Sequence, residues 1–352
     1  MEFVQQLKPY VAKIAGRPDP VYEVVKLAGD ASNRQYFRIR LTDGSAPPTL
    51  VAMVFNPADA LRSEEAAGDS LPARLPFLDV GRYLQRGGVR VPDVYLEDVP
   101  KGFIFLEDVG DRQLFALVHE AGEEARRGWY RRAIDTLVGF QTLTRTRPEP
   151  ACPAFTREFT HDLLMWEFDH YLEWGVEALY DRRIPEDDRT AFHSHFDRIC
   201  RSLRKLPQVV VHRDYQSRNL MVHRDELVVI DFQDALWGPV PYDLVALLRD
   251  SYVALDEALV DDLVDYYIAR AVPEKQGELT REGFRRGFLL QTVQRKLKDA
   301  GRFVFIDRVK KNPSFLPNIP TSLGYVRWAL ARLPEYGELG ALLARYEERL
   351  AP

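Results

Sequence analysis

The chain has 352 residues, of which 46% are hydrophobic and 29% charged, a composition that is typical of a folded globular protein and excludes collagen-like or largely disordered chains. A net charge of -5 gives no general attraction to nucleic acid or to an anionic membrane, so we expect neither partner. The length predicts two domains or lobes. Cys152 and Cys200 lie far apart and show no CxxC spacing, and no apolar run is long enough for a membrane span, so we expect a cytoplasmic protein.

The first third of the chain predicts a sheet of five strands. After a short leading helix, residues 21–41 alternate with the period of strands around a polar loop, which predicts a hairpin. A third strand is expected at 50–55 and a helix at 76–85. Two further strands are expected at 94–97 and 103–106. We therefore predict a β-rich N-terminal lobe over residues 1–108.

The remainder, residues 109–352, is predicted to be a mainly helical lobe. Two short β-branched runs, 209–211 and 227–230, are the exception, and we expect them to form a hairpin over 208–234. The fold class is therefore α+β, with a small β-rich N-terminal lobe and a larger α-helical C-terminal lobe. The helices are expected at 114–119, 125–144, 156–177, 185–206, 242–254, 256–271, 280–300 and 322–350.

Three polar residues in this hairpin have spacing suited to phosphoryl transfer. Asp214 and Asn219 would lie in one loop, and Asp231 would follow the second strand. A hairpin would bring Asn219 and Asp231 together as oxygen ligands for Mg²⁺, while Asp214 faces an incoming hydroxyl. The structural alternative is an ordinary polar turn, in which these side chains only bond to turn backbone.

These residues resemble the HxDxxxxN catalytic loop and the metal-binding aspartate of the aminoglycoside phosphotransferase branch of the protein-kinase-like superfamily. The order of the two lobes agrees over nearly the whole chain. Further segments resemble the bacterial anomeric kinases of N-acetylmuramate and N-acetylglucosamine, enzymes of cell-wall sugar recycling. These segments are 29–38, 106–111, 231–235, 238–244, 247–250 and 294–298.

The resemblance implies a two-lobed kinase fold in which the N-terminal lobe, residues 1–108, binds the nucleotide, with ATP and Mg²⁺ as cofactors. It implies that Asp214 is the base or orients the acceptor hydroxyl, and that Asn219 and Asp231 bind Mg²⁺. Backbone groups of Glu107 to Val109 would contact adenine. The phosphate loop would consist of Gly29, Asp30, Ala31, Ser32 and Asn33.

One expected part is missing, because Met53 stands where such kinases usually carry a phosphate-binding lysine. Arg34 and Arg38 are the candidates for the missing charge, and Arg218 is a candidate for stabilising the transferred phosphoryl group. We interpret His212 as structural, because Asp214 already has the role of base. Candidate sugar contacts are Asp234, Glu167, Asp169 and Glu173.

Three functions are compatible with these residues. The first is an ATP-dependent kinase of the anomeric C1 hydroxyl of N-acetylmuramate or N-acetylglucosamine. The second is a kinase for another small alcohol, such as an aminoglycoside, choline, homoserine or a different sugar. The third is a nucleotide-binding pseudokinase, for which Met53 is the only support. The sequence leaves the oligomeric state and the choice between ATP and GTP open.

Overall fold

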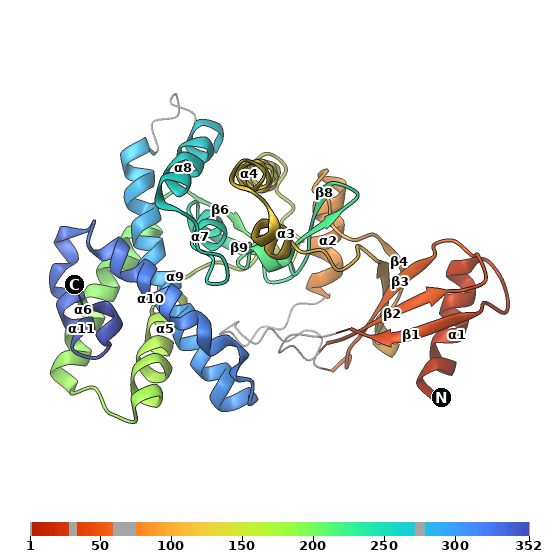
Figure 1. Ribbon diagram of the computed structural model, residues 1–352, viewed down its shortest axis with the longest axis horizontal. Coiled ribbons are helices and arrows are strands. Elements are labelled where there is room, and N and C mark those ends of the chain that lie inside the picture. The colour runs from red at the N-terminus through yellow and green to blue at the C-terminus, as the bar shows by residue number, and fades with distance from the viewer. Residues whose placement is uncertain (1, 28–33, 59–74, 272–278, 352) are drawn as a thin grey trace.

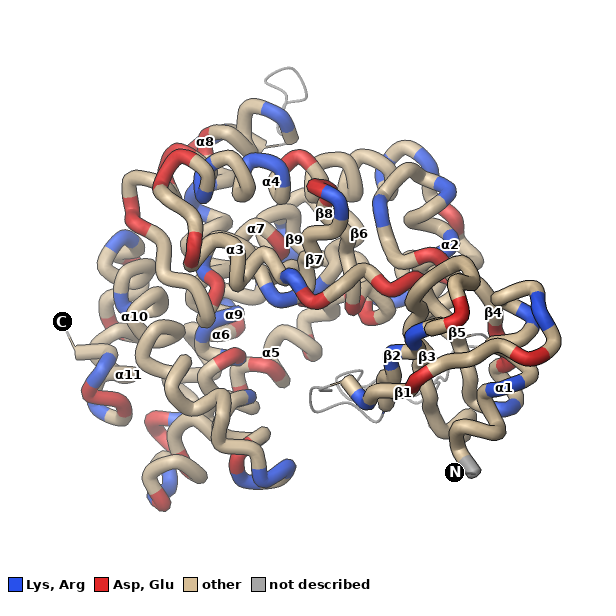
Figure 2. The backbone as a smooth tube through the Cα atoms, turned by 45° about the vertical axis from the view of Figure 1, so that its right-hand side comes forward, with Lys and Arg blue, Asp and Glu red and all other residues tan. Residues whose placement is uncertain are grey.

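The computed structural model describes residues 2–27, 34–58, 75–271 and 279–351. A small β-rich lobe and a larger helical lobe lie side by side, joined by a short hinge (Figure 1). This arrangement confirms the predicted two-lobed α+β fold. Lys and Arg residues are interspersed with Asp and Glu over both lobes (Figure 2). No helix in the described ranges is both long and apolar enough to cross a membrane.

The five predicted N-terminal strands form one antiparallel sheet in the order β1-β2-β3-β5-β4. Helix α1 (Glu2–Ala15) packs its apolar side on one face, and α2 (Pro76–Arg86) lies on the other. Successive side chains of the third strand, β3 (Thr49–Val54), point to opposite faces of the sheet. Ala52 packs towards α1, whereas Met53 is fully buried on the α2 side. The strands are β1 (Tyr22–Lys26), β2 (Gln35–Leu41), β3 (Thr49–Val54), β4 (Val94–Asp98) and β5 (Phe103–Glu107).

The helical lobe contains most of the predicted helices, with different ends. The predicted helix at 156–177 begins later, because the Thr160 side chain caps it by accepting from Leu163 N–H, and it continues as a π-helix, η3 (Tyr171–Ala178). The predicted helix at 322–350 is broken before Pro334. The helices are α3 (Leu114–Glu120), α4 (Glu123–Thr146), α5 (His161–His170), α6 (Glu186–Arg204), α7 (Tyr242–Leu248), α8 (Glu257–Ala271), α9 (Arg281–Lys310), α10 (Ile319–Leu330) and α11 (Gly337–Ala344).

Helix α9 runs through the centre of this lobe and extends ten residues beyond its predicted end (Figure 1). It packs closely on η3 at Gly301. A Cβ at Gly301 would lie 2.8 Å from Tyr171 Cα, so the close approach requires glycine.

The predicted pairing of the two β-branched runs was wrong. Strand β6 (Gln208–Val211) pairs with β9 (Leu236–Pro239), while β7 (Leu220–His223) pairs with β8 (Glu226–Val229). Residues Arg224 and Asp225 both have positive φ, so they close a tight turn that joins β7 directly to β8. The loop containing Asp214 therefore connects β6 to β7, and Asp231 follows β8. A backbone hydrogen bond of 3.0 Å from Ile230 N–H to Asn219 O joins the two segments.

Candidate active site

Two buried carboxylates fix the loop between β6 and β7. The carboxylate of Asp243, at the start of α7, accepts the backbone N–H groups of His212 at 2.7 Å and Arg213 at 3.0 Å. Asp250 accepts the backbone N–H and the hydroxyl of Ser217, at 2.9 and 2.5 Å. Burial raises the pKa of both carboxyl groups, that of Asp243 to about 6. The loop backbone is thus held by the core of the helical lobe.

His212 connects the two segments that carry the site. Its Nε2 donates to Ile230 O at 2.9 Å, and its Nδ1 accepts from Asp214 N–H at 3.2 Å. Burial lowers the pKa of His212, so this neutral tautomer satisfies both contacts. The structural interpretation of His212 is confirmed.

The structure brings Asp214, Asn219 and Asp231 together. Asn219 Nδ2 donates to Asp214 O at 2.8 Å and lies 3.4 Å from Asp231 Oδ2. Asp231 has a φ of +64°. The pKa of Asp231 is raised to about 6 because the surrounding protein desolvates its carboxylate and Asp214 adds a second negative charge. The site therefore favours a cation.

The donor set fits Mg²⁺ bound together with phosphates. Both hydrogen bonds of the Asn219 amide use its nitrogen, so its oxygen can serve as a ligand beside the Asp231 carboxylate. The described residues contain no group of three His, Cys, Asp or Glu side chains that could hold a metal by itself. Nucleotide phosphates and water would therefore have to complete the coordination, as Mg²⁺ sites in phosphotransferases commonly require.

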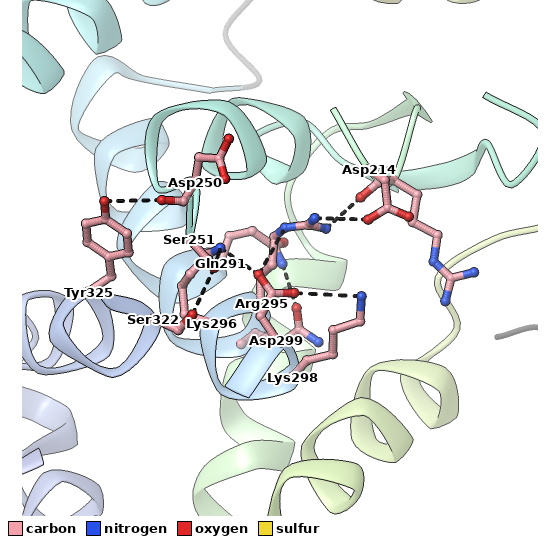
Figure 3. A network of polar contacts seen from close by, with 12 residues as sticks. Asp214, Asp250, Ser251, Gln291, Arg295, Lys296, Lys298, Asp299, Ser322 and Tyr325 are labelled. Atoms are coloured by element: carbon pink, nitrogen blue, oxygen red, sulfur yellow. Dashed lines mark hydrogen bonds and ion pairs between the residues drawn. The ribbon is translucent and has the colours of Figure 1, made fainter. Parts of the chain in front are cut away.

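Arg295 is a site residue to which the sequence reasoning gave no role. This α9 side chain is 1% exposed, and it donates to Arg213 O at 2.6 Å and to Asp214 Oδ1 at 3.1 Å (Figure 3). It therefore orients the Asp214 carboxylate from outside the catalytic loop. The only signal in the sequence was the family-like segment 294–298, because a single arginine within a long helix has no diagnostic spacing.

The proposed phosphate cations have different surroundings. The Arg38 guanidinium lies 2.7 to 2.9 Å from the carboxylates of Asp108 and Asp111 in the hinge. The prediction that Arg38 contacts phosphate is therefore corrected, because two carboxylates already occupy its donors. Arg34 lies near Tyr36 and near Asp231. Burial and the charge of Asp214 raise the pKa of Asp231, and the positive charge of Arg34 partly opposes that rise. The predicted phosphate loop, Gly29, Asp30, Ala31, Ser32 and Asn33, lies outside the described residues.

A small apolar cluster lies beside the hinge. Val109 packs with Met221, Val228 and Ile230 in a small cluster beside the catalytic loop. The N–H of Glu107 donates to Asp93 O at 2.8 Å, so only the carbonyl of Glu107 stays a candidate for an adenine contact. The adenine contact of Val109 stays a prediction.

The remaining predicted residues lie at varying distances from this cluster. Arg218 stacks between the rings of Tyr252 and Phe115, at 3.7 and 5.0 Å from their centroids, and its catalytic role stays a prediction. Asp234 lies next to Asp231, with its carboxylate 3.8 Å from Arg157, and its sugar contact stays a prediction.

The acidic residues of α5 and η3 were predicted as sugar contacts. Glu167 is fully buried and accepts from Gln294 at 2.6 Å, so its predicted sugar contact is corrected to a structural role. Asp169 binds His193 of α6 at 2.7 Å and therefore faces another helix. Glu173 is exposed on η3. The last two have no observed link to the catalytic loop.

A β-rich lobe, a short hinge and a helical lobe that presents Asp214, Asn219 and Asp231 together define a protein-kinase-like phosphotransferase. The phosphotransferase enzyme family model (APH) matches residues 23–279, and the chain belongs to this family. It is an enzyme, and ATP is the phosphoryl donor that membership of a kinase family implies.

Two relatives are similar over almost their whole length. The N-acetylmuramate/N-acetylglucosamine kinase of Neisseria meningitidis serogroup B is 34% identical over 333 residues, which cover 93% of this chain and 91% of the relative. The kinase of the same name from Pseudomonas aeruginosa is 31% identical over 339 residues, or 95% and 91% of the two chains. An ADP-bound aminoglycoside phosphotransferase superposes with a TM-score of 0.59 at 13% identity, covering 91% of this chain and 97% of that chain, and it supports the fold alone.

Proposed function

We propose that the protein is an ATP-dependent kinase that phosphorylates the anomeric C1 hydroxyl of N-acetylmuramate or N-acetylglucosamine. The convergence of Asp214, Asn219 and Asp231 carries the kinase part of this proposal. The choice of acceptor is supported by similarity to two kinases named for these sugars, at 31 to 34% identity over more than nine tenths of each chain.

Asp214 would orient the acceptor hydroxyl and accept its proton as the phosphoryl group transfers. Its Oδ1 is held by Arg295 at 3.1 Å, which leaves the other oxygen to face the hydroxyl. A hemiacetal hydroxyl is more acidic than that of a simple alcohol, so a carboxylate is an adequate base for C1. Positioning and charge neutralisation then account for most of the catalysis.

Asn219 and Asp231 would hold Mg²⁺, which neutralises charge on the ATP phosphates. ATP would lie between a nucleotide-binding lobe, residues 1–108, and a sugar-binding lobe, residues 109–352, with its base against the hinge. Because Met53 is fully buried in the core, it places no charge near phosphate, and Arg34 is the described cation that we assign to that task.

A panel of free sugars and amino alcohols tests this proposal. ADP release with ATP and Mg²⁺ should be greatest with N-acetylmuramate or N-acetylglucosamine, and the product should be an acid-labile anomeric phosphate. The methyl glycoside of either sugar, blocked at C1, should be inert, whereas a 6-deoxy analogue should react. Asp214→Asn is the control for contaminating kinases. Phosphorylation of the methyl glycoside at C6 would contradict the anomeric assignment, and preferential turnover of choline or an aminoglycoside would contradict the sugar assignment.

A further inference from the structure

The carboxylate of Asp231 has a protein partner that lies outside the catalytic loop. Gln233, two residues further along the chain, donates from its side-chain amide nitrogen, Nε2, to Asp231 Oδ1 at 2.8 Å. The same nitrogen lies 3.4 Å from Asp234 Oδ2. Two carboxylates are therefore within hydrogen-bonding distance of one NH₂ group, whose two hydrogens can serve both of them.

The hydrogen bond from Gln233 gives the two oxygens of Asp231 different surroundings. Oδ1 accepts from Gln233, whereas Oδ2 lies 3.4 Å from the amide of Asn219, the other residue of the proposed cation site. An amide that binds one carboxylate oxygen fixes the direction of the other, which here faces Asn219. Burial raises the pKa of Asp231 and the hydrogen bond from Gln233 opposes that rise, so the amide favours the ionised form that binds a cation.

The Gln233 side chain occupies its place at a cost to stability. Gln233 is 8% exposed, and its amide oxygen, Oε1, is buried and has no hydrogen-bond partner among the described residues. A buried acceptor without a partner is unfavourable, and an apolar side chain of similar size would avoid that cost. Packing alone therefore gives no reason for a glutamine here, whereas the contact of Nε2 with the Asp231 carboxylate does.

The backbone around Gln233 is anchored by two other parts of the chain. The guanidinium of Arg157 donates to Gln233 O at 2.6 Å. The neighbouring ring of Phe232 is buried and stacks on Phe77 of α2, with 5.2 Å between the ring centroids. Because its backbone is held in this way, the Gln233 side chain can fix the Asp231 carboxylate in one direction.

We infer that Gln233 is a positioning residue for the cation site: its amide orients the Asp231 carboxylate so that Oδ2 faces the cation beside Asn219. The inference rests on the proposed function, whose cation site it specifies further, and it concerns a residue to which the sequence reasoning gave no role. Gln233 acts through Asp231 and does not contact the metal itself. Hydrogen-bond partners of metal ligands typically change metal affinity by about tenfold to a hundredfold.

The test measures how tightly Mn²⁺, which like Mg²⁺ prefers oxygen ligands, binds to the complex of the protein with ADP, from the EPR signal of free Mn²⁺. Gln233→Met keeps the approximate size of the side chain but cannot donate a hydrogen bond. It should weaken Mn²⁺ binding by about tenfold to a hundredfold. The affinity for ADP without metal should stay as in the wild type, because Gln233 acts on the Asp231 carboxylate rather than on the nucleotide.

Gln208→Met is the matched control for the loss of a glutamine amide. Gln208 Nε2 also has two acceptors, the carbonyl oxygens of Leu203 at 3.2 Å and Leu206 at 2.7 Å, and both lie outside the cation site. This variant should lower the midpoint of thermal unfolding and keep the wild-type affinity for Mn²⁺. A loss of Mn²⁺ binding in Gln233→Met that only follows its unfolded fraction would overturn the positioning role.

An Asp231→Asn background distinguishes positioning from direct contact with the cation. Gln233→Met should then cost little further Mn²⁺ affinity, because no carboxylate remains to be oriented. A further loss as large as in the wild-type background would overturn the positioning role and place Gln233 on the cation itself.

The wild-type measurement separates this inference from the function on which it rests. Wild-type Mn²⁺ affinity in Gln233→Met would overturn the inference and leave the proposed function intact. If the wild-type complex with ADP binds no Mn²⁺, the proposed cation site fails, and the positioning role of Gln233 fails with it.

Discussion

Replacing Arg295 by lysine separates the charge of this buried residue from its geometry. Arg295 uses two different nitrogens, Nη1 to Arg213 O at 2.6 Å and Nη2 to Asp214 Oδ1 at 3.1 Å. A lysine ammonium at this place keeps the charge but cannot reproduce the two-point contact that holds the carboxylate. One charge-assisted hydrogen bond, worth about 1.5 to 3 kcal/mol, would be lost. We expect kcat to fall by about tenfold to a hundredfold, because this contact fixes the base in the orientation that the transition state needs.

The assay is steady-state ADP release at saturating acceptor, combined with thermal unfolding. The KM for ATP should change by less than about twofold, since Arg295 acts on Asp214 rather than on the nucleotide. Arg286→Lys is the matched control: it lies on the same helix, but its guanidinium binds Glu335 at the surface and it should be nearly silent. An unchanged kcat in Arg295→Lys, or a loss that only follows the unfolded fraction, would refute the positioning role.

Two further predictions concern the metal and the cations of the small lobe. Asp231→Asn removes the charged ligand of the proposed cation site and should abolish turnover without lowering the midpoint of thermal unfolding; full activity would remove Asp231 from the mechanism. Arg34→Ala should raise the KM for ATP by about tenfold if Arg34 contacts phosphate. Arg38→Ala should instead lower the unfolding temperature, because it leaves Asp108 and Asp111 without their shared partner, and an Arg38 variant with native stability would contradict the hinge role.

The sequence predicts the parts of this fold that are local. Alternating strands and periodic helices reveal themselves within a few residues, and the five-stranded sheet and most helices were predicted within a few residues of their ends. Strand pairing is not local. The runs 209–211 and 227–230 looked like partners because each is apolar and β-branched, but the tight turn at Arg224 and Asp225 pairs β8 with β7 instead.

The candidate site shows the same division. Asp214, Asn219 and Asp231 were predicted as a group because the catalytic loop that they resemble has fixed spacing along the chain, and the structure brings them together. Arg295 reaches Asp214 from a helix 81 residues later, and nothing in its neighbourhood marks that contact. Arg38 and Glu167 were assigned to ligands because charged residues near a site usually face it. In the structure Arg38 is paired with Asp108 and Asp111, and Glu167 lies 3.5 Å from Arg213, pairings that only tertiary packing determines.

Asp243 makes the anchoring of the catalytic loop dependent on pH. Burial raises its pKa from 3.8 to about 6 in the folded protein. The folded state therefore binds this proton more tightly than the unfolded state, and stability at this group falls as pH rises from about 4 to about 6. The change in the free energy of unfolding is on the order of 2 to 3 kcal/mol.

Asp243→Asn lacks the titration, although it loses one of the two acceptors for His212 and Arg213 N–H. We expect the variant to have a lower free energy of unfolding than the wild type at pH 5. The difference between the two proteins should be smaller at pH 7.5, as measured by urea unfolding at both pH values. A stability difference independent of pH would show that the Asp243 carboxylate stays ionised throughout.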